Sequence, residues 1–249
     1  MMSLDAENQV EEFIRSAGPT FNLYMGVAER RKATKSTKEN CCRLSVMFVD
    51  IDFKDTSQAE ARVLLAAFSL SPSVVLHSGN GLHVYWLLRE PINLEGKNVA
   101  SVEGMLKRLA KALRADDAAT NVNRLLRIPG TLNHKYNPPR VATIETWEPR
   151  RWYTYDDIDG AVPAPEQVQS AAVAQIERTN GAKPQAAALR LHPRRPMSRE
   201  MKRLLSTGDY NGRYRSRSEP IQGLALAFVN AVGLSVTTMV WPPRTSRIA

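Results

Sequence analysis

The chain has 249 residues, of which 43% are hydrophobic and 24% charged. This composition is typical of a globular protein and supplies enough apolar side chain for a sizeable core. No run of about eighteen apolar residues occurs, so the sequence predicts no transmembrane helix and no membrane partner. The N-terminal residues are acidic and amphipathic without a cleavable apolar stretch, which argues against secretion.

The only cysteines are Cys41 and Cys42. Adjacent cysteines cannot form a disulfide in ordinary geometry, and two are too few for a zinc-binding set. The sequence therefore predicts a protein of the reducing cytoplasm.

The net charge of +9 is distributed unevenly. Residues 1–160 carry 21 basic and 20 acidic side chains, whereas residues 161–249 carry 13 basic and 5 acidic ones. A nearly neutral body with a tail of net charge +8 suggests a catalytic domain joined to a segment that binds a polyanion. A solvated, poorly ordered tail would have the same composition, so charge alone does not decide between them.

Helical and strand patterns alternate along the body. Gly18 ends the first helical pattern, Ser57 and Glu60 form a capping box, and Asn80-Gly81 is a strong hairpin signal between two apolar runs. In chain order, the predicted elements are a helix at 4–17, strands at 20–27 and 45–53, a helix at 57–68, strands at 74–77 and 82–88, a helix at 94–114, a strand at 141–147 and a short edge strand at 152–158.

This mixture predicts one α+β domain over residues 1–160. Residues 161–196 are rich in Ala, Gln, Pro and Arg without a sustained period, and we interpret them as a linker. Residues 197–249 form a basic segment in which Ser218 could cap a short helix that ends at Gly233.

Asp50 and Asp52 lie two residues apart in the strand at 45–53, so their side chains point the same way. Two neighbouring carboxylates repel each other unless a cation lies between them, and a divalent ion with oxygen ligands would supply it. Two ions could share the pair. A strand end at which both acids reach solvent or cap the next helix is the structural alternative.

Ser78 and His83 flank the turn Ser78-Gly79-Asn80-Gly81. Its glycines allow backbone N–H groups to approach an anion closely, so Ser78 and His83 could converge on a phosphate. A strand histidine that only packs in the core is the alternative for His83.

A third cluster follows the helix at 94–114. Asp116 or Asp117 could complete a three-carboxylate metal site, and arginines could bind phosphates through fork-like hydrogen bonds. A solvated helix end with arginines paired to nearby acids is the alternative. The basic members of this cluster are Arg124, Arg127 and Lys135.

Three segments resemble the catalytic motifs of the archaeo-eukaryotic primase superfamily, in particular the RepB-like primases of plasmids and phages. They are FVDIDFK, SGNGLHVYW and ADDAATNVNRLLRIPGTLNHK. The resemblance runs from about Thr20 to Trp147, and residues 216–235 resemble more weakly the helical module that often follows such a domain. It implies an RRM-like antiparallel sheet packed by helices, with a flanking αβ unit and a short C-terminal helical segment.

The resemblance also implies roles for individual residues. Asp50, Asp52 and Asp116 would hold two Mg²⁺ or Mn²⁺ ions, with Asp117 as the less favoured third carboxylate. Ser78 and His83 would contact the phosphates of the incoming nucleotide, and His83 would be part of the catalytic set. Supporting contacts to phosphates or template would come from Arg124, Arg127 and Lys135.

These motifs favour a nucleotidyltransferase that makes primers from NTPs or dNTPs on single-stranded DNA during plasmid or phage replication. The sequence has no Walker-type Gly-x-x-x-x-Gly-Lys-Ser/Thr segment, so a helicase or origin-binding protein would be a separate partner. A non-catalytic DNA-binding initiator with the same fold is the main alternative. A rolling-circle nicking enzyme would need a His-x-His pair, which is absent, and a sugar-nucleotide transferase leaves the arginine-rich segment unexplained.

Overall fold

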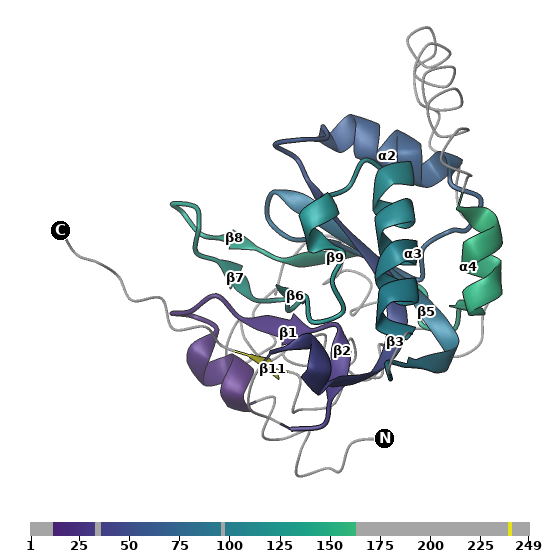
Figure 1. The fold of residues 1–249 in the computed structure, drawn as a ribbon. Helices are drawn as coiled ribbons and strands as arrows, with labels where there is room; N and C mark the ends of the chain where they lie inside the picture. Colours follow the sequence, from purple (N-terminus) through teal and green to yellow (C-terminus); the bar gives the residue numbers. More distant parts are fainter. Residues whose placement is uncertain (1–11, 33–35, 96–97, 163–238, 241–249) are drawn as a thin grey trace, which may run out of the picture.

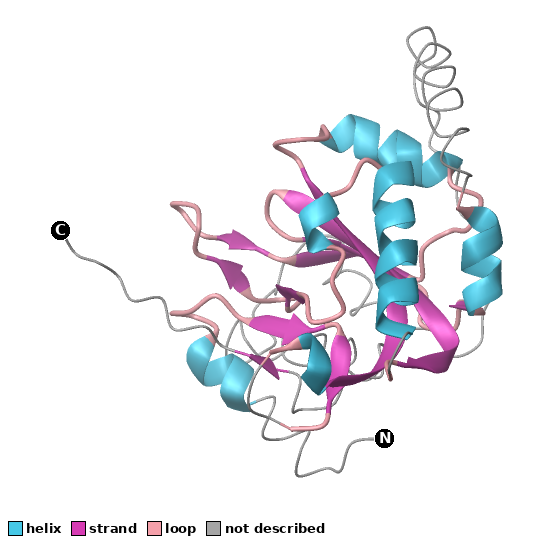
Figure 2. Ribbon diagram, in the orientation of Figure 1, coloured by secondary structure: helices cyan, strands magenta, loops and turns pink. Residues whose placement is uncertain are grey.

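The computed structural model describes residues 12–32, 36–95, 98–162 and 239–240. Strands and helices are mixed in this part of the chain, and most neighbouring strands run antiparallel (Figure 2). The predicted α+β class is therefore confirmed. None of the described helices is long and apolar enough to cross a membrane.

Residues 12–17 are helical, and residues 4–11 of the first predicted helix lie outside the described residues. The strands are β1 (Tyr24–Gly26), β2 (Ala28–Arg30), β3 (Cys41–Asp52), β4 (Val74–His77), β5 (Gly81–Asn93), β6 (Leu125–Arg127), β7 (Leu132–Asn133), β8 (Arg140–Val141), β9 (Thr143–Trp147), β10 (Trp152–Tyr153) and β11 (Met239–Val240). The helices are α2 (Gln58–Ala67), α3 (Asn98–Ala112) and α4 (Tyr155–Ala161), with short 3₁₀ turns η1 (Lys38–Asn40) and η2 (Asp117–Ala119).

The main sheet has the strand order β2-β3-β5-β4-β9, and β10 adds a parallel pair to β5. Its centre is the long antiparallel pair β3–β5, in which Asp50 lies opposite His83 and Asp52 opposite Gly81. Since β4 and β5 are joined by the predicted tight turn, residues 78–80 lie at the same end of the sheet as both aspartates. The topology thus brings two of the sequence motifs together.

Helix α3 covers this sheet because its apolar residues recur at helical spacing on one side (Figure 1). Helix α2 begins at the predicted cap, where the side chain of Ser57 accepts a hydrogen bond from the N–H of Glu60. The buried residues of α3 are Val102, Met105, Leu106, Leu109 and Ala110.

Two smaller sheets lie beside the main one. The first has the order β11-β1-β6, and the second is the β7–β8 pair. The N–H of Val27 donates to the carbonyl of Arg124, which ties the chain between β1 and β2 to the residue that precedes β6. The strand predicted at 20–27 is shorter in the structure and consists of β1 alone. The strand β2, which the sequence did not predict, follows it and pairs in a different sheet.

Several predicted boundaries differ from the structure. The helix predicted from residue 94 begins at Asn98. The strand predicted at 141–147 is divided between β8 and β9, since the N–H of Ala142 donates to Thr131 rather than to the main sheet. The edge strand predicted at 152–158 is wrong after Tyr153, because Thr154 and Asp157 form a capping box that starts α4. Most of the predicted linker and the helix predicted from Ser218 lie outside the described residues.

Candidate functional site

A cleft of about 140 Å³ lies at the end of the β3–β5 pair. It brings seven of the sequence-predicted site residues together, although they come from four separate parts of the chain: Asp50, Asp52, Ser78, His83, Arg124, Arg127 and Lys135. Further lining residues are Tyr24, Asn80, Gly81, Leu125, Leu126, Asn133 and Tyr136.

Asp50 is the most enclosed of the acids, with its side chain 19% exposed. One of its oxygens lies 3.0 Å from Nη2 of Arg124, and the other lies 3.6 Å from Nε2 of His83. The same Nη2 of Arg124 is 3.8 Å from Oδ2 of Asp116. The Arg124 guanidinium therefore lies between two carboxylates and offsets their repulsion.

Asp116 is fixed beside Asp50 by the backbone, since its N–H donates to the carbonyl of Asp50 at 2.8 Å. Its Oδ1 also accepts from the N–H of Ala118, which caps the η2 turn. Asp117 is exposed, and no ion pair among the described residues involves it. Of the two candidates, Asp116 is the one whose side chain approaches Asp50 and Arg124.

The carboxylates do not form a closed cage in this conformation. Among the residues that the structure describes, no three His, Cys, Asp or Glu side chains are arranged to hold a metal ion. Asp116 is also not part of the cleft lining, whereas Asp50 and Asp52 are. Nevertheless, the donors are carboxylate oxygens, which suit Mg²⁺ and Mn²⁺, and the Arg124 guanidinium already lies against two of them. The residues present thus fit a hard divalent cation.

His83 is 5% exposed and lies deep at the cleft. Burial lowers the pKa of its imidazole to about 4, although the Asp50 carboxylate acts in the opposite direction. His83 is therefore neutral at pH 7, and its buried Nδ1 has no hydrogen-bond partner in the described structure. A neutral imidazole facing a carboxylate can orient a ligand without adding charge.

The turn between β4 and β5 is held from two sides. Gly79 has a positive φ of 102°, and the amide of Asn133 donates to the carbonyl of Ser78 at 2.9 Å. Arg140 donates to the carbonyl of Gly79 at 2.8 Å, and the N–H of Gly79 donates to Nδ1 of His77. Ser78 is thus presented to the cleft on a firmly tied backbone.

Arg127 is 3% exposed, and its guanidinium donates hydrogen bonds to other groups of the protein. Its guanidinium donates to Asn133 Oδ1 at 3.0 Å and lies 4.9 Å from the centre of the Tyr24 ring. Burial lowers the pKa of Arg127. Its remaining acceptors are Asn22 Oδ1, the Leu132 carbonyl and the Tyr24 hydroxyl. Arg127 thus contributes positive potential to the cleft wall, with four of its hydrogen bonds used internally.

Several residues around the cleft were not predicted from the sequence. Tyr24 comes from β1 and reaches the cleft only through sheet pairing with β6, so no local pattern could reveal it. Tyr136 and Arg140 follow the third motif and lie on either side of Pro138-Pro139. This aromatic and basic pair around two prolines was the available sequence signal. The Arg140 guanidinium lies 4.0 Å from the centre of the Tyr136 ring.

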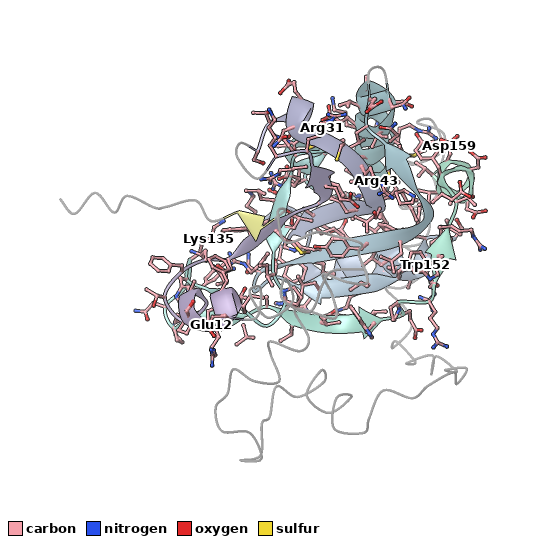
Figure 3. All side chains as sticks on the ribbon, turned by 90° about the horizontal axis from the view of Figure 1, so that it is seen from below. Glu12, Arg31, Arg43, Lys135, Trp152 and Asp159 are labelled. Carbon is pink, nitrogen blue, oxygen red and sulfur yellow. The ribbon has the colours of Figure 1, made fainter. Side chains whose placement is uncertain are left out.

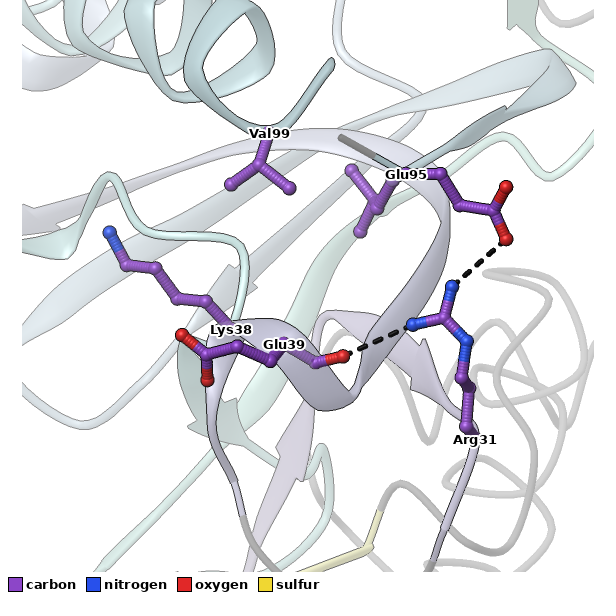
Figure 4. A pocket seen from close by; sticks show the side chains of 6 residues that line it. Arg31, Lys38, Glu39, Glu95 and Val99 are labelled. Carbon is purple, nitrogen blue, oxygen red and sulfur yellow. Dashed lines mark hydrogen bonds and ion pairs between the residues drawn. The ribbon is translucent and has the colours of Figure 1, made fainter. Parts of the chain in front are cut away.

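A larger cavity of about 480 Å³ lies elsewhere, near the start of α3 (Figure 4). Its cations are already paired, since Arg31 contacts Glu95 at 3.0 Å and Lys38 contacts Glu103 at 2.7 Å. This cavity therefore lacks the free positive charge that a phosphate ligand would need.

Comparison with known families matches residues 23–181 to the RepB DNA-primase N-terminal domain. A replication protein of Clostridium perfringens is 29% identical over 125 residues, which cover 47% of this chain and 30% of that protein. The chain thus aligns with less than a third of this curated relative.

Among solved structures, the AEP domain of the cyanophage S-2L primase-polymerase has a TM-score of 0.49 at 19% identity. The alignment covers 61% of this chain and 76% of that domain. The crystal structure of primase RepB′ has a TM-score of 0.35 at 15% identity, with 70% and 65% of the two chains covered. The RepB′ catalytic domain in complex with initiator DNA has a TM-score of 0.34 at 16% identity, with 72% and 100% covered.

Proposed function

Because the chain belongs to the RepB DNA-primase family, we propose that it is a metal-dependent nucleotidyltransferase that synthesises primers on single-stranded DNA. The observation that carries this proposal is the cleft in which Asp50, Asp52 and His83 converge beside the Ser78–Gly81 turn. Acidic oxygen donors and a backbone turn suited to phosphates then share one small volume.

The acids would hold the metal. Asp50 and Asp52 line the cleft on one strand face, and Asp116 is fixed to Asp50 through its backbone. Bound Mg²⁺ or Mn²⁺ would supply charge neutralisation of the phosphates and activation of the attacking 3′-hydroxyl.

The remaining side chains would position the nucleotide. Arg124 is 30% exposed and can reach a triphosphate, and the exposed Lys135 at the cleft can reach a triphosphate or the template. His83 would donate a hydrogen bond to a phosphate oxygen from its neutral ring, and Ser78 would do so from the turn. Most of the catalytic effect would come from positioning and electrostatics, as in other phosphoryl transfers.

The proposal extends to partners and location. NTPs or dNTPs and a single-stranded DNA template would be the substrates in plasmid or phage replication, in the cytoplasm of the host cell. A separate helicase or origin-binding protein would open the duplex. The basic residues 161–249 would add salt-dependent affinity for DNA.

One observation favours a second candidate, a non-catalytic DNA-binding initiator. Arg124 lies against both Asp50 and Asp116, so these acids already have a cationic partner. In such a protein the acids would only stabilise the fold, and Asp50→Asn would leave the affinity for DNA unchanged.

Primer synthesis on single-stranded circular DNA with labelled nucleotides and Mg²⁺ or Mn²⁺ tests the proposal. We expect wild-type chain to form metal-dependent oligonucleotides, and Asp50→Asn and His83→Ala to form none. Asp159→Asn is the matched control, since this exposed residue of α4 pairs with Arg108 outside the cleft. A wild type without products, binding DNA as well as the Asp50→Asn variant does, would establish the initiator instead.

A further inference from the structure

The hairpin of β7 and β8, residues 132–141, is a basic arm beside the cleft. Figure 1 shows it reaching outward on the side of the molecule opposite α4. Leu132 pairs with Val141 and Asn133 with Arg140. Residues 131–144 include Lys135 and Arg140 and contain no acidic residue. The arm is therefore positively charged along its length.

Its two cations are not neutralised locally. The ion pairs of the described residues involve neither Lys135 nor Arg140, and both residues are exposed. Charges in this state attract polyanions and release counterions when they bind phosphate.

An aromatic ring accompanies the charges. The Arg140 guanidinium lies 4.0 Å from the centre of the Tyr136 ring, and Tyr136 remains partly exposed where it lines the cleft. Rings and guanidinium planes are the surfaces on which unpaired bases stack. In duplex DNA the bases are already stacked on one another, so this surface suits a single strand.

The arm is held rigidly against the cleft. Arg140 donates to the Gly79 carbonyl and to Oδ1 of Asn80, and Asn133 donates to the Ser78 carbonyl. A strand lying on the arm would therefore be placed next to the turn of Ser78–Gly81 without a loop rearrangement.

We propose that the β7–β8 hairpin binds the single-stranded DNA template, with Tyr136 stacking on a base and Lys135 and Arg140 contacting phosphates. That the bound strand serves as a template rests on the proposed priming function, whereas binding of the strand to the hairpin is tested separately. The hairpin would guide the strand past the cleft while the acids act on the nucleotide.

The test is fluorescence anisotropy of a labelled thymidine oligonucleotide of about 20 bases with the full chain at several salt concentrations. We expect Tyr136→Ala to weaken binding roughly 5- to 100-fold through lost stacking, and Tyr136→Phe to bind like wild type. Lys135→Ala should lower the slope of log affinity against log salt by about 0.7.

Two exposed residues supply matched controls. Trp152 lies on the other side of the molecule from Lys135 in Figure 3, so Trp152→Ala removes an exposed ring away from the hairpin. Lys107→Ala removes an exposed cation of α3. Both variants should bind the oligonucleotide as wild type does.

The outcomes separate this inference from the proposed function. Wild-type priming with unchanged binding by Tyr136→Ala would overturn the hairpin surface and leave the primase proposal intact. Binding that depends on the hairpin without any priming would support the hairpin surface and overturn the primase proposal. If wild type does not bind the oligonucleotide, both are overturned. Photo-crosslinking of wild type to an oligonucleotide with 5-iodouracil gives a readout without a variant, and crosslinks confined to residues outside the hairpin would contradict the proposal.

Discussion

Arg124 is a resident cation among the acids of the cleft. Its Nη2 lies 3.0 Å from Asp50 and 3.8 Å from Asp116, and its buried Nε has no hydrogen-bond partner in the described structure. An arginine in this position stabilises the metal-free site and competes with a divalent ion for the same oxygens.

We therefore expect Arg124→Gln to lower stability in EDTA, by about 1–2 kcal/mol, because Asp50 loses a charged hydrogen-bond partner and Asp116 loses an ion pair. The variant should gain more from Mn²⁺ than wild type does, since no cation competes for Asp50. Thermal unfolding with EDTA and with Mn²⁺ measures both effects. Arg108→Gln breaks the exposed pair with Asp159 and serves as control. Equal Mn²⁺ shifts in wild type and Arg124→Gln would argue against competition.

His77 couples pH to the turn at the cleft. Its Nδ1 accepts the Gly79 N–H at 3.1 Å and must be unprotonated to do so, and burial lowers its pKa below the ordinary 6.5. A folded pKa below the unfolded value means that protonation favours the unfolded chain. The stabilisation is complete above pH 6.5 and declines as the pH falls below it toward the lowered folded value.

His77→Gln should accordingly flatten the fall of unfolding free energy between pH 7.5 and pH 4.5. Denaturant unfolding at a series of pH values measures it, and the difference between the two proteins removes the contribution of His83, whose lowered pKa acts in the same direction. Parallel curves for wild type and variant would show that His77 carries none of the pH dependence.

At the scale of elements, the β4–β5 turn and the β7–β8 hairpin form one tied unit. A Cβ on Gly79 would lie 3.0 Å from Nδ2 of Asn133 and 3.3 Å from Cβ of Arg140, at a φ that L side chains rarely adopt. Gly79 thus allows the close approach that places Ser78 at the cleft.

Gly79→Ala should destabilise the protein by about 1–3 kcal/mol, through backbone strain and displacement of Asn133. Gly104→Ala is a matched control in α3, where a new Cβ meets nothing within 4 Å, and it should stabilise by about 0.5–1 kcal/mol. Urea unfolding of both variants gives the comparison. A neutral Gly79→Ala would mean that the turn adapts at no cost.

Local sequence patterns predicted the elements whose structure depends on residues close together in the chain. The β4–β5 hairpin and α2 were predicted because Asn80-Gly81 and the Ser57 cap are local signals, although the positive φ of the turn falls on Gly79. The short extent of β1 within 20–27 and the separate strand β2 after it were missed, since their cause is pairing with β6 and with β3 in different sheets. The same applies to the site: Asp50 and His83 were found by motif, whereas Tyr24 reaches the cleft only through tertiary pairing.

At the scale of the whole molecule, charge is separated along the chain. Residues 1–160 have a net charge of +1, and residues 161–249 have a net charge of +8. The family match extends to residue 181, and residues 161–181 carry one basic and two acidic side chains, so the positive excess lies beyond the matched domain. A nearly neutral body would bind DNA weakly by electrostatics alone, and the basic residues beyond it offset this.

The basic residues of this C-terminal region should contact DNA phosphates. Replacing Arg194, Arg195 and Arg199 by Gln should reduce the slope of log affinity for single-stranded DNA against log salt by up to about 2, since each phosphate contact contributes roughly 0.7. The control variant replaces Lys107, Arg108 and Lys111 of α3, which removes the same formal charge from the body and should leave the slope nearly unchanged. Anisotropy titrations of both full-length variants between 50 and about 300 mM NaCl measure the slopes. If the variant without Arg194, Arg195 and Arg199 has the same slope as wild type, the body alone makes the phosphate contacts. The β7–β8 hairpin would then have to supply them.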